Sequence, residues 1–316
     1  MKQSKNNILM DFNYLDKLYN SNDLNDVRKF YESVDSVEEL VKFSKRRPKA
    51  RVKFFKKGFD NEKNVIAVIP TADSSKFSDF FDGRIPEVLV ESSGPYFNYA
   101  HSLNSGVKEA LKYNPEWIII CNDDLFKIDD VEKMLGEINK NTNKDFLLAK
   151  PGYYNRVWYH TMPTQLIERG SIDYHTYKLT GLVDSNLREM LKITGKFNVE
   201  RFAYAVFPTH ESVFRMWWRL IFLSSFRKPA FYNIGDFSII RSEVFKKIKF
   251  NELFINSHED AFFSYQLKSF DGVFTGYRVG SFIGKTLGKL KGGVRIRKLR
   301  NAFIGAVIFD HLLSKF

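Results

Sequence analysis

A short apolar segment that ends in acids constrains the fold of this chain more than any other feature. Trp117–Cys121 is rich in β-branched side chains, and its length predicts a buried strand. Asn122, Asp123 and Asp124 follow it directly. In an open α/β sheet, ligands bind beyond the carboxyl ends of the strands, where adjacent carboxylates suit a hard divalent cation and, through it, a diphosphate. The alternative is a helix N-cap or a turn, in which Asn and Asp are also favoured.

Strands and helices alternate around this segment. Short apolar runs at Val65–Ile69 and Glu87–Glu91 predict two more strands, and helical spacing predicts helices over Leu103–Leu111 and from Asp129 to Ile138. The same alternation returns after the middle of the chain, with strands predicted at 145–149 and 237–240 and helices beginning near 241 and 258. Such alternation predicts a parallel, doubly wound sheet flanked by helices.

The two ends of the chain have a different character. Ser36 and Glu39 form a capping box, so we expect a helical N-terminal extension. Apolar side chains from Asn301 to Phe316 predict an amphipathic C-terminal helix. Residues 150–230 are aromatic-rich and irregular, and the dense apolar run at 213–223 is either a core helix, which we favour, or an interfacial helix.

Charge and composition restrict the partners. The formal net charge of +12 favours nucleic acid, a phosphorylated substrate or an anionic membrane surface. Two basic segments without acids, Lys42–Lys57 and Lys285–Arg300, are each most simply explained as solvated surface. The single cysteine, Cys121, excludes an intrachain disulfide. No apolar stretch is long enough to cross a bilayer and no secretory signal follows Met1, so we expect a cytoplasmic protein, with peripheral membrane contact as a hypothesis.

Several of these segments, in this order, resemble a known family, the inverting glycosyltransferases of family 2, which have the GT-A fold. The resemblance spans residues 64 to 267 and leaves the middle unmatched. It implies a Rossmann-like α/β domain with a mixed, mainly parallel sheet flanked by helices. The matching segments are Val65–Thr71, Val90–Ser93, Asn98–Val107, Ile118–Asp124, Gly235–Phe245 and His258–Asp260.

The resemblance also implies a division of the chain. It predicts a catalytic domain over 61–275, which lies between the helical extension over 1–60 and a basic loop with the C-terminal helix over 276–316 that the residues themselves indicate. Within the catalytic domain, 61–150 would form the nucleotide-binding half and 151–275 the acceptor half. The acceptor would be a glycan, a lipid-linked molecule or a protein. The basic loop would cover the donor diphosphate or touch an anionic membrane, and we do not expect nucleic acid as a partner.

By resemblance, the matched residues acquire roles in transfer from a nucleotide-sugar donor. Asp124, with Asp123, would hold Mn²⁺ or Mg²⁺, which stabilises the departing diphosphate. Asp260 would be the general base, supported by Glu259. His258 is a further candidate metal ligand. The remaining candidates lie at the nucleotide edge: Thr71, Asp73, Glu91, Asn104 and Asp123.

Two departures from the family keep a second hypothesis open. Glu91 stands where the family usually has Asp, and the stretch 276–293 lacks the His that often completes the metal site. A basic nucleic-acid- or membrane-binding protein on a degenerate scaffold is therefore the alternative, although it has no need of Asp260. A nucleotidyltransferase is a third hypothesis, disfavoured because residues 70–75 lack its Gly-rich loop.

Overall fold

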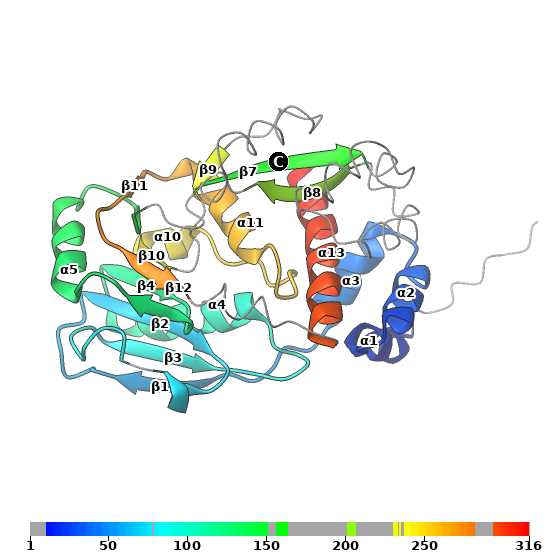
Figure 1. Ribbon diagram of the computed structural model, residues 1–316, viewed down its shortest axis with the longest axis horizontal. Helices are drawn as coiled ribbons and strands as arrows, with labels where there is room; N and C mark the ends of the chain where they lie inside the picture. The colour runs from blue at the N-terminus through cyan, green and yellow to red at the C-terminus, as the bar shows by residue number, and fades with distance from the viewer. Residues whose placement is uncertain are drawn as a thin grey trace, which may run out of the picture.

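The computed structural model describes residues 11–77, 79–150, 156–163, 201–206, 230–232, 234, 237–281 and 293–315 (Figure 1). The apolar run at 213–223 and the basic segment up to 292 therefore lie outside the described residues. So does most of the expected acceptor half.

The fold is a mixed α/β arrangement built on a seven-stranded sheet, which confirms the predicted class. Parallel pairing joins β2 to both β3 and β4, and β6 to β11. The strands β1 and β10 are antiparallel to their neighbours. In spatial order the strands are β1 (Lys53–Lys57), β3 (Glu87–Glu91), β2 (Val65–Thr71), β4 (Trp117–Cys121), β10 (Phe237–Arg241), β6 (Phe146–Leu148) and β11 (Gly272–Phe274).

Helices cover both faces of the central part of this sheet, which explains why β2, β3 and β4 are mostly apolar and buried. Alternate side chains of β4 enter different clusters: Ile118 and Ile120 pack with α4 on one face, whereas Trp117 and Ile119 pack with α5 on the other. The helices of this region are α4 (Tyr99–Ala110), α5 (Val131–Lys140), α10 (Ser242–Lys247) and α11 (Glu259–Gln266), with short 3₁₀ turns at Ser74–Lys76, Leu111–Tyr113 and Leu267–Ser269.

Two small sheets complete the described strands. One pairs β5 (Leu125–Lys127) with β12 (Val279–Ser281), and the other contains β8 (Arg201–Val206), β7 (Arg156–Pro163) and β9 (Ala230–Tyr232). The main sheet also begins earlier than expected. The strand β1 lies inside the 1–60 extension and pairs along its whole length with β3.

The N-terminal extension and the C-terminal helix form one helical unit. Figure 1 shows α1 (Phe12–Asn20), α2 (Leu24–Glu32) and α3 (Val37–Arg46) gathered beside the lower part of α13 (Gly293–Leu313). The buried Tyr19 lies at the centre of this unit. Each basic segment places one guanidinium group near its ring: that of Arg47 lies 5.2 Å from the ring centroid, and that of Arg300 lies 4.4 Å from it. Both arginines are buried, so the expectation of solvated basic surfaces is wrong for these two residues.

Hydrogen bonds explain why these two charges tolerate burial. Arg47 is paired with the buried Asp16 at 3.2 Å and also donates to the carbonyl oxygen of Pro95. Arg300 donates to the carbonyl oxygens of Tyr19 and Ser21. Buried charges persist when they are paired and hydrogen-bonded. The bond to Pro95 ties the helical unit to the loop before α4.

The C-terminal helix, which we predicted to be amphipathic, buries its apolar side chains inside the protein. Its side chains at Phe303, Ile304, Val307, Ile308 and Phe309 are all buried. In this arrangement those side chains pack inside the protein and do not form an exposed apolar stripe. Among the described helices, none combines the length and apolar character needed to span a bilayer.

Candidate functional site

Three predicted site segments end at the same edge of the sheet. Because β2, β3 and β4 are parallel, their carboxyl ends lie together, and we call this the carboxyl edge. Thr71 and Glu91 are register partners there, and Asn122 leads out of β4 beside them. The opposite edge, where these strands begin, is the amino edge.

A hydrogen-bonded cluster joins the predicted nucleotide-edge residues. Oε2 of Glu91 accepts from the backbone N of Ser74 at 3.0 Å and from its Oγ at 2.7 Å. These bonds lower the pKa of the Glu91 carboxyl. Thr71 Oγ1 accepts from the backbone N of Asp73 at 3.2 Å. Thr71, Asp73 and Glu91 are thus brought together, and Ser74, which our sequence interpretation missed, connects them.

The two acidic clusters are connected through the beginning of α4. The hydroxyl of Tyr99 donates to Oδ1 of Asn122, the residue immediately before Asp123 and Asp124. The backbone N of the same Tyr99 donates to Oδ1 of Asn256 at 2.8 Å. Asn256 in turn donates to the carbonyl oxygen of Phe97 at 2.9 Å. Tyr99 therefore contacts both the loop after β4 and the turn that leads into Glu259 and Asp260.

The turn before α11 has unusual backbone geometry. Asn256 has φ of 53° and His258 has φ of 69°, so two non-glycine residues adopt the left-handed conformation within three positions. Such conformations are strained for most side chains and concentrate at functional sites. The turn rests on α13 at Gly305, where a Cβ would approach Nδ1 of His258 and the carbonyl oxygen of Ser257 to 2.8 Å each.

Glu259 and Asp260 are neighbouring carboxyls at the first turn of α11. Burial raises the pKa of Glu259 well above its usual range, and the Asp260 charge raises it further. Burial also raises the pKa of Asp260, against a 2.7 Å hydrogen bond from the backbone N of Ala261. Within the described part of the chain, Oε2 of Glu259 is buried without a hydrogen-bond partner. The pair therefore retains a proton at a pH where solvated carboxyls have lost theirs.

The predicted metal ligands differ in how far their side chains are exposed to solvent. Asp123 is exposed, whereas Oδ1 of Asp124 is buried. Nδ1 of His258 lies 2.7 Å from Oγ of Ser257, and burial lowers the pKa of this imidazole to about 4. These contacts favour a structural role for His258. In the described ranges, no cluster of three or more His, Cys, Asp or Glu side chains is placed to hold a metal ion.

Asn104 holds a neighbouring segment in place. Its amide donates to the carbonyl oxygen of Phe250 at 2.9 Å and to Oε1 of Glu252 at 3.0 Å, while its Oδ1 accepts from the backbone N of Phe250 at 3.1 Å. Lys49 pairs with the same Glu252 at 2.9 Å. These bonds fix α4 against the segment that precedes the strained turn, and none of them involves Thr71, Asp73 or Glu91.

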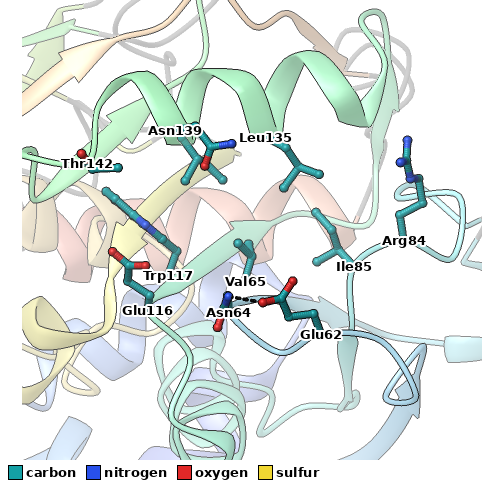
Figure 2. Close-up of a pocket in the computed structure, with 11 residues that line it drawn as sticks. Glu62, Asn64, Val65, Arg84, Ile85, Glu116, Trp117, Leu135, Asn139 and Thr142 are labelled. Atoms are coloured by element: carbon teal, nitrogen blue, oxygen red, sulfur yellow. Dashed lines mark hydrogen bonds between the residues drawn. The ribbon is translucent and has the colours of Figure 1, made fainter.

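A pocket of about 290 Å³ lies at the other end of the sheet (Figure 2). It opens between the first residues of β2 and β4, Val65 and Trp117, and the α5 side chains Leu135 and Asn139. None of the predicted site residues lines it. The pocket therefore belongs to the amino edge and is separate from the candidate site.

Comparisons with known proteins do not assign a family. No family model matches the chain, and no curated protein matches it. A solved structure described as "Crystal Structure of A197 from STIV" is similar over 69% of this chain and 85% of that chain, with 13% identity and a TM-score of 0.36. A likeness at that level carries no argument about fold or function.

Proposed function

We propose that this protein is a metal-dependent inverting glycosyltransferase of the GT-A fold. It moves a sugar from a nucleoside-diphosphate donor to an acceptor hydroxyl. One observation carries the proposal: Tyr99 hydrogen-bonds both to the residue before Asp123 and Asp124 and to the turn before Glu259 and Asp260. A transferase of this kind needs carboxylates that hold a cation against the leaving diphosphate and a base near the acceptor, and we assign these two roles to the two clusters.

In this proposal, residues at the carboxyl edge bind the nucleotide-sugar donor and its metal ion. Glu91, held by Ser74, presents an ionised carboxylate to the nucleoside. Asp124 and Asp123 would hold Mg²⁺ or Mn²⁺, which binds through one or two carboxylates together with substrate phosphates and water. The small number of acidic ligands fits that mode of binding. When bound, the ion supplies Lewis-acid stabilisation of the departing phosphate.

For the acceptor half of the reaction, we propose the acid pair Glu259 and Asp260, of which Glu259 is buried. Burial raises the pKa of both carboxyls, and the Asp260 charge raises that of Glu259 further, so the pair holds a proton to higher pH than solvated carboxyls do. A buried carboxylate of raised pKa is a stronger base than a solvated one. Asp260 therefore accepts the proton of the acceptor hydroxyl as its oxygen attacks the anomeric carbon. A single displacement of this kind inverts the configuration at that carbon.

Thermal unfolding with Mn²⁺ and each nucleoside diphosphate in turn tests the donor half. A ligand that binds only the folded protein at about 100 times its Kd stabilises it by about 2.7 kcal/mol. We expect a shift with at least one diphosphate, its loss in Asp124→Ala, and its retention in Asp271→Ala. Asp271 is a matched control, because it is an exposed aspartate next to β11 that pairs with Lys144.

Hydrolysis of the matching nucleotide-sugar tests the acceptor half. We expect Asp260→Asn to lose turnover and to keep the diphosphate-induced shift, because the base does not hold the donor phosphates. Loss of both would contradict the role of Asp260 as a base. If no diphosphate stabilises the wild-type protein, the proposed donor is wrong, and the alternative of a basic binding protein takes precedence.

A further inference from the structure

The pocket at the amino edge is a second candidate binding site, because none of its residues takes part in the proposed transfer reaction. It lies between the beginning of the sheet and one side of α5, and its volume is about 290 Å³ (Figure 2). An engineered protein cavity of about 150 Å³ binds benzene, so this pocket has room for an aromatic ring system with a short side chain. Small-molecule sites of this kind combine an apolar lining with a few polar groups that fix the orientation of the ligand.

Both layers of the fold contribute apolar side chains to the floor of this pocket. Val65 and Trp117 are register partners where β2 and β4 begin. Leu135 and Ile138 of α5 line the same space, and Ile85, just before β3, completes it. Ile85, Trp117 and Ile138 are buried, so the protein core lies directly behind the floor. Because aromatic rings pack favourably against an indole, this floor favours a ligand with an aromatic ring.

The rim of the pocket is polar, and one of its charged side chains lacks an ion-pair partner. The polar residues of the rim are all exposed: Glu62, Asn64, Arg84, Glu116, Asn139 and Thr142. Glu116 pairs with Arg241 at 2.8 Å. Arg84 pairs with Glu132. Glu62 accepts a hydrogen bond from the side-chain amide of Asn64, and no lysine or arginine of the described ranges pairs with it. The mouth of the pocket therefore presents one carboxylate that is free to meet a cation.

The charges of the rim restrict the chemistry of the ligand. An anion would compete with Glu132 for Arg84 and would be repelled by Glu62. A cation, in contrast, meets Glu62 without breaking an existing ion pair. We propose that the pocket at the amino edge binds a small aromatic amine, whose ring lies on the apolar floor and whose ammonium group lies beside Glu62. The proposal does not depend on the sugar-transferase activity.

A ligand-observed NMR titration of the full chain with tryptamine tests the proposal. This probe joins an indole ring to an ammonium group through two carbons, and we expect saturable binding with a Kd of about a millimolar or below. Two analogues isolate the charge: tryptophol has a hydroxyl in place of the ammonium, and indole-3-acetate has a carboxylate. Because an exposed ion pair contributes modestly, tryptophol should bind roughly three- to fivefold more weakly, and indole-3-acetate more weakly still.

Matched variants locate the bound probe. Asn139→Trp places a large side chain at the rim and should weaken tryptamine binding roughly tenfold. Lys140→Trp introduces the same side chain at the next exposed position of α5, which does not line the pocket, and should leave binding unchanged. Glu62→Gln should weaken the binding of tryptamine roughly three- to fivefold and leave that of tryptophol unchanged. Glu243→Gln, at an exposed glutamate of α10, should change neither.

Three results overturn the proposal. The first is the absence of saturable tryptamine binding up to about 10 mM. The second is equal affinity for the amine, the alcohol and the carboxylate, or tighter binding of the carboxylate, because either result means that Glu62 does not select the ligand. The third is an equal effect of Asn139→Trp and Lys140→Trp, which places the bound amine outside this pocket.

Discussion

The two ends of the sheet each have a buried glutamate, and the comparison shows what distinguishes a candidate active site. Burial raises the pKa of Glu259, which lies near the carboxyl edge. Burial also raises the pKa of Glu87, in β3 at the amino edge, to about 7. Both have side-chain oxygens that are buried without a hydrogen-bond partner among the described residues. Glu259 follows a strained turn and adjoins a second acid, whereas Glu87 lies in a regular strand.

This difference indicates that burial alone is a poor marker of chemistry. A carboxyl in an apolar environment has a raised pKa wherever it lies. Near the carboxyl edge, Glu259 has a second carboxyl at the adjacent position and follows two left-handed residues. Asp82 and Asn114 are also left-handed, and each lies two residues before a residue that lines the pocket at the amino edge, so the adjacent second carboxyl is the feature that distinguishes the carboxyl edge. The predictions below test this distinction between the two edges.

The largest expected effect is the loss of the base. Asp260→Asn removes the proton acceptor and keeps the shape, so donor turnover should fall by about 10²- to 10⁴-fold, the usual contribution of general base catalysis. Glu87→Gln is the control at the amino edge and should keep turnover within about threefold, since its carboxyl is distant from the reacting atoms in the proposed mechanism. Steady-state kinetics with the matching donor measures both, and equal losses in the two variants would remove the distinction between the edges.

The second prediction concerns stability at the amino edge. Between the ordinary Glu pKa of 4.5 and about 7, the folded protein keeps the Glu87 proton and the unfolded chain has lost it. The folded state binds more protons, so stability falls as pH rises through this window, by up to about 3 kcal/mol. Glu87→Gln should remove that fall. Urea unfolding at pH 5 and pH 8 measures it, with Glu243→Gln, an exposed glutamate on α10, as the unaffected control.

Regular elements with both faces buried were predictable from the sequence. The ranges Glu87–Glu91 and Trp117–Cys121 agree with β3 and β4, because a strand covered on both sides must be apolar throughout. The strand β1 was missed for the opposite reason. It is exposed at every position, so no burial pattern appears in its sequence, and its lysines merged with the surrounding basic segment.

The candidate site was predictable only in part. Strand ends identify Asp124 and Glu91, since the parallel topology fixes where those ends lie. Asn256 and His258 adopt the left-handed conformation although neither is a glycine, the residue that usually signals this conformation in a sequence. The buried arginines were missed likewise. Arg47 and Arg300 are far apart in sequence, and only the packed structure brings both to Tyr19.

The third prediction compares two tightly packed glycines. A Cβ at Gly106 of α4 would lie 2.5 Å from Cγ1 of Val68, and one at Gly305 would lie 2.8 Å from Nδ1 of His258. Overpacking usually costs about 1–3 kcal/mol, so Gly106→Ala and Gly305→Ala should both lower the free energy of unfolding. Only Gly305→Ala presses on the turn that carries Glu259 and Asp260, whereas Gly106→Ala also presses on Val90, beside Glu91. We therefore expect only Gly305→Ala to lower turnover at saturating donor, at a temperature where both variants remain folded.

If the two glycine variants lose turnover equally, the effect comes from general destabilisation and the turn has no special position. The comparison therefore requires chemical denaturation to match their stabilities, followed by kinetics with the matching donor. A selective loss in Gly305→Ala would also link the C-terminal helix to the site, because Gly305 lies on α13 and His258 immediately before α11.

The smallest expected effect compares single hydroxyl groups at the two ends of one helical segment. Tyr99 begins α4 at the carboxyl edge and donates to Asn122, whereas Tyr113, in the turn that follows α4, accepts from Lys56 at 3.0 Å. Tyr99→Phe and Tyr113→Phe each remove one hydrogen bond and should each cost about 0.5–1.5 kcal/mol or less. Only Tyr99→Phe loosens Asn122 against the turn at Asn256, so it alone should raise the Mn²⁺ concentration required for half-maximal stabilisation by a nucleoside diphosphate. An equal requirement in both variants would mean that the Tyr99 hydroxyl does not position the acids after β4.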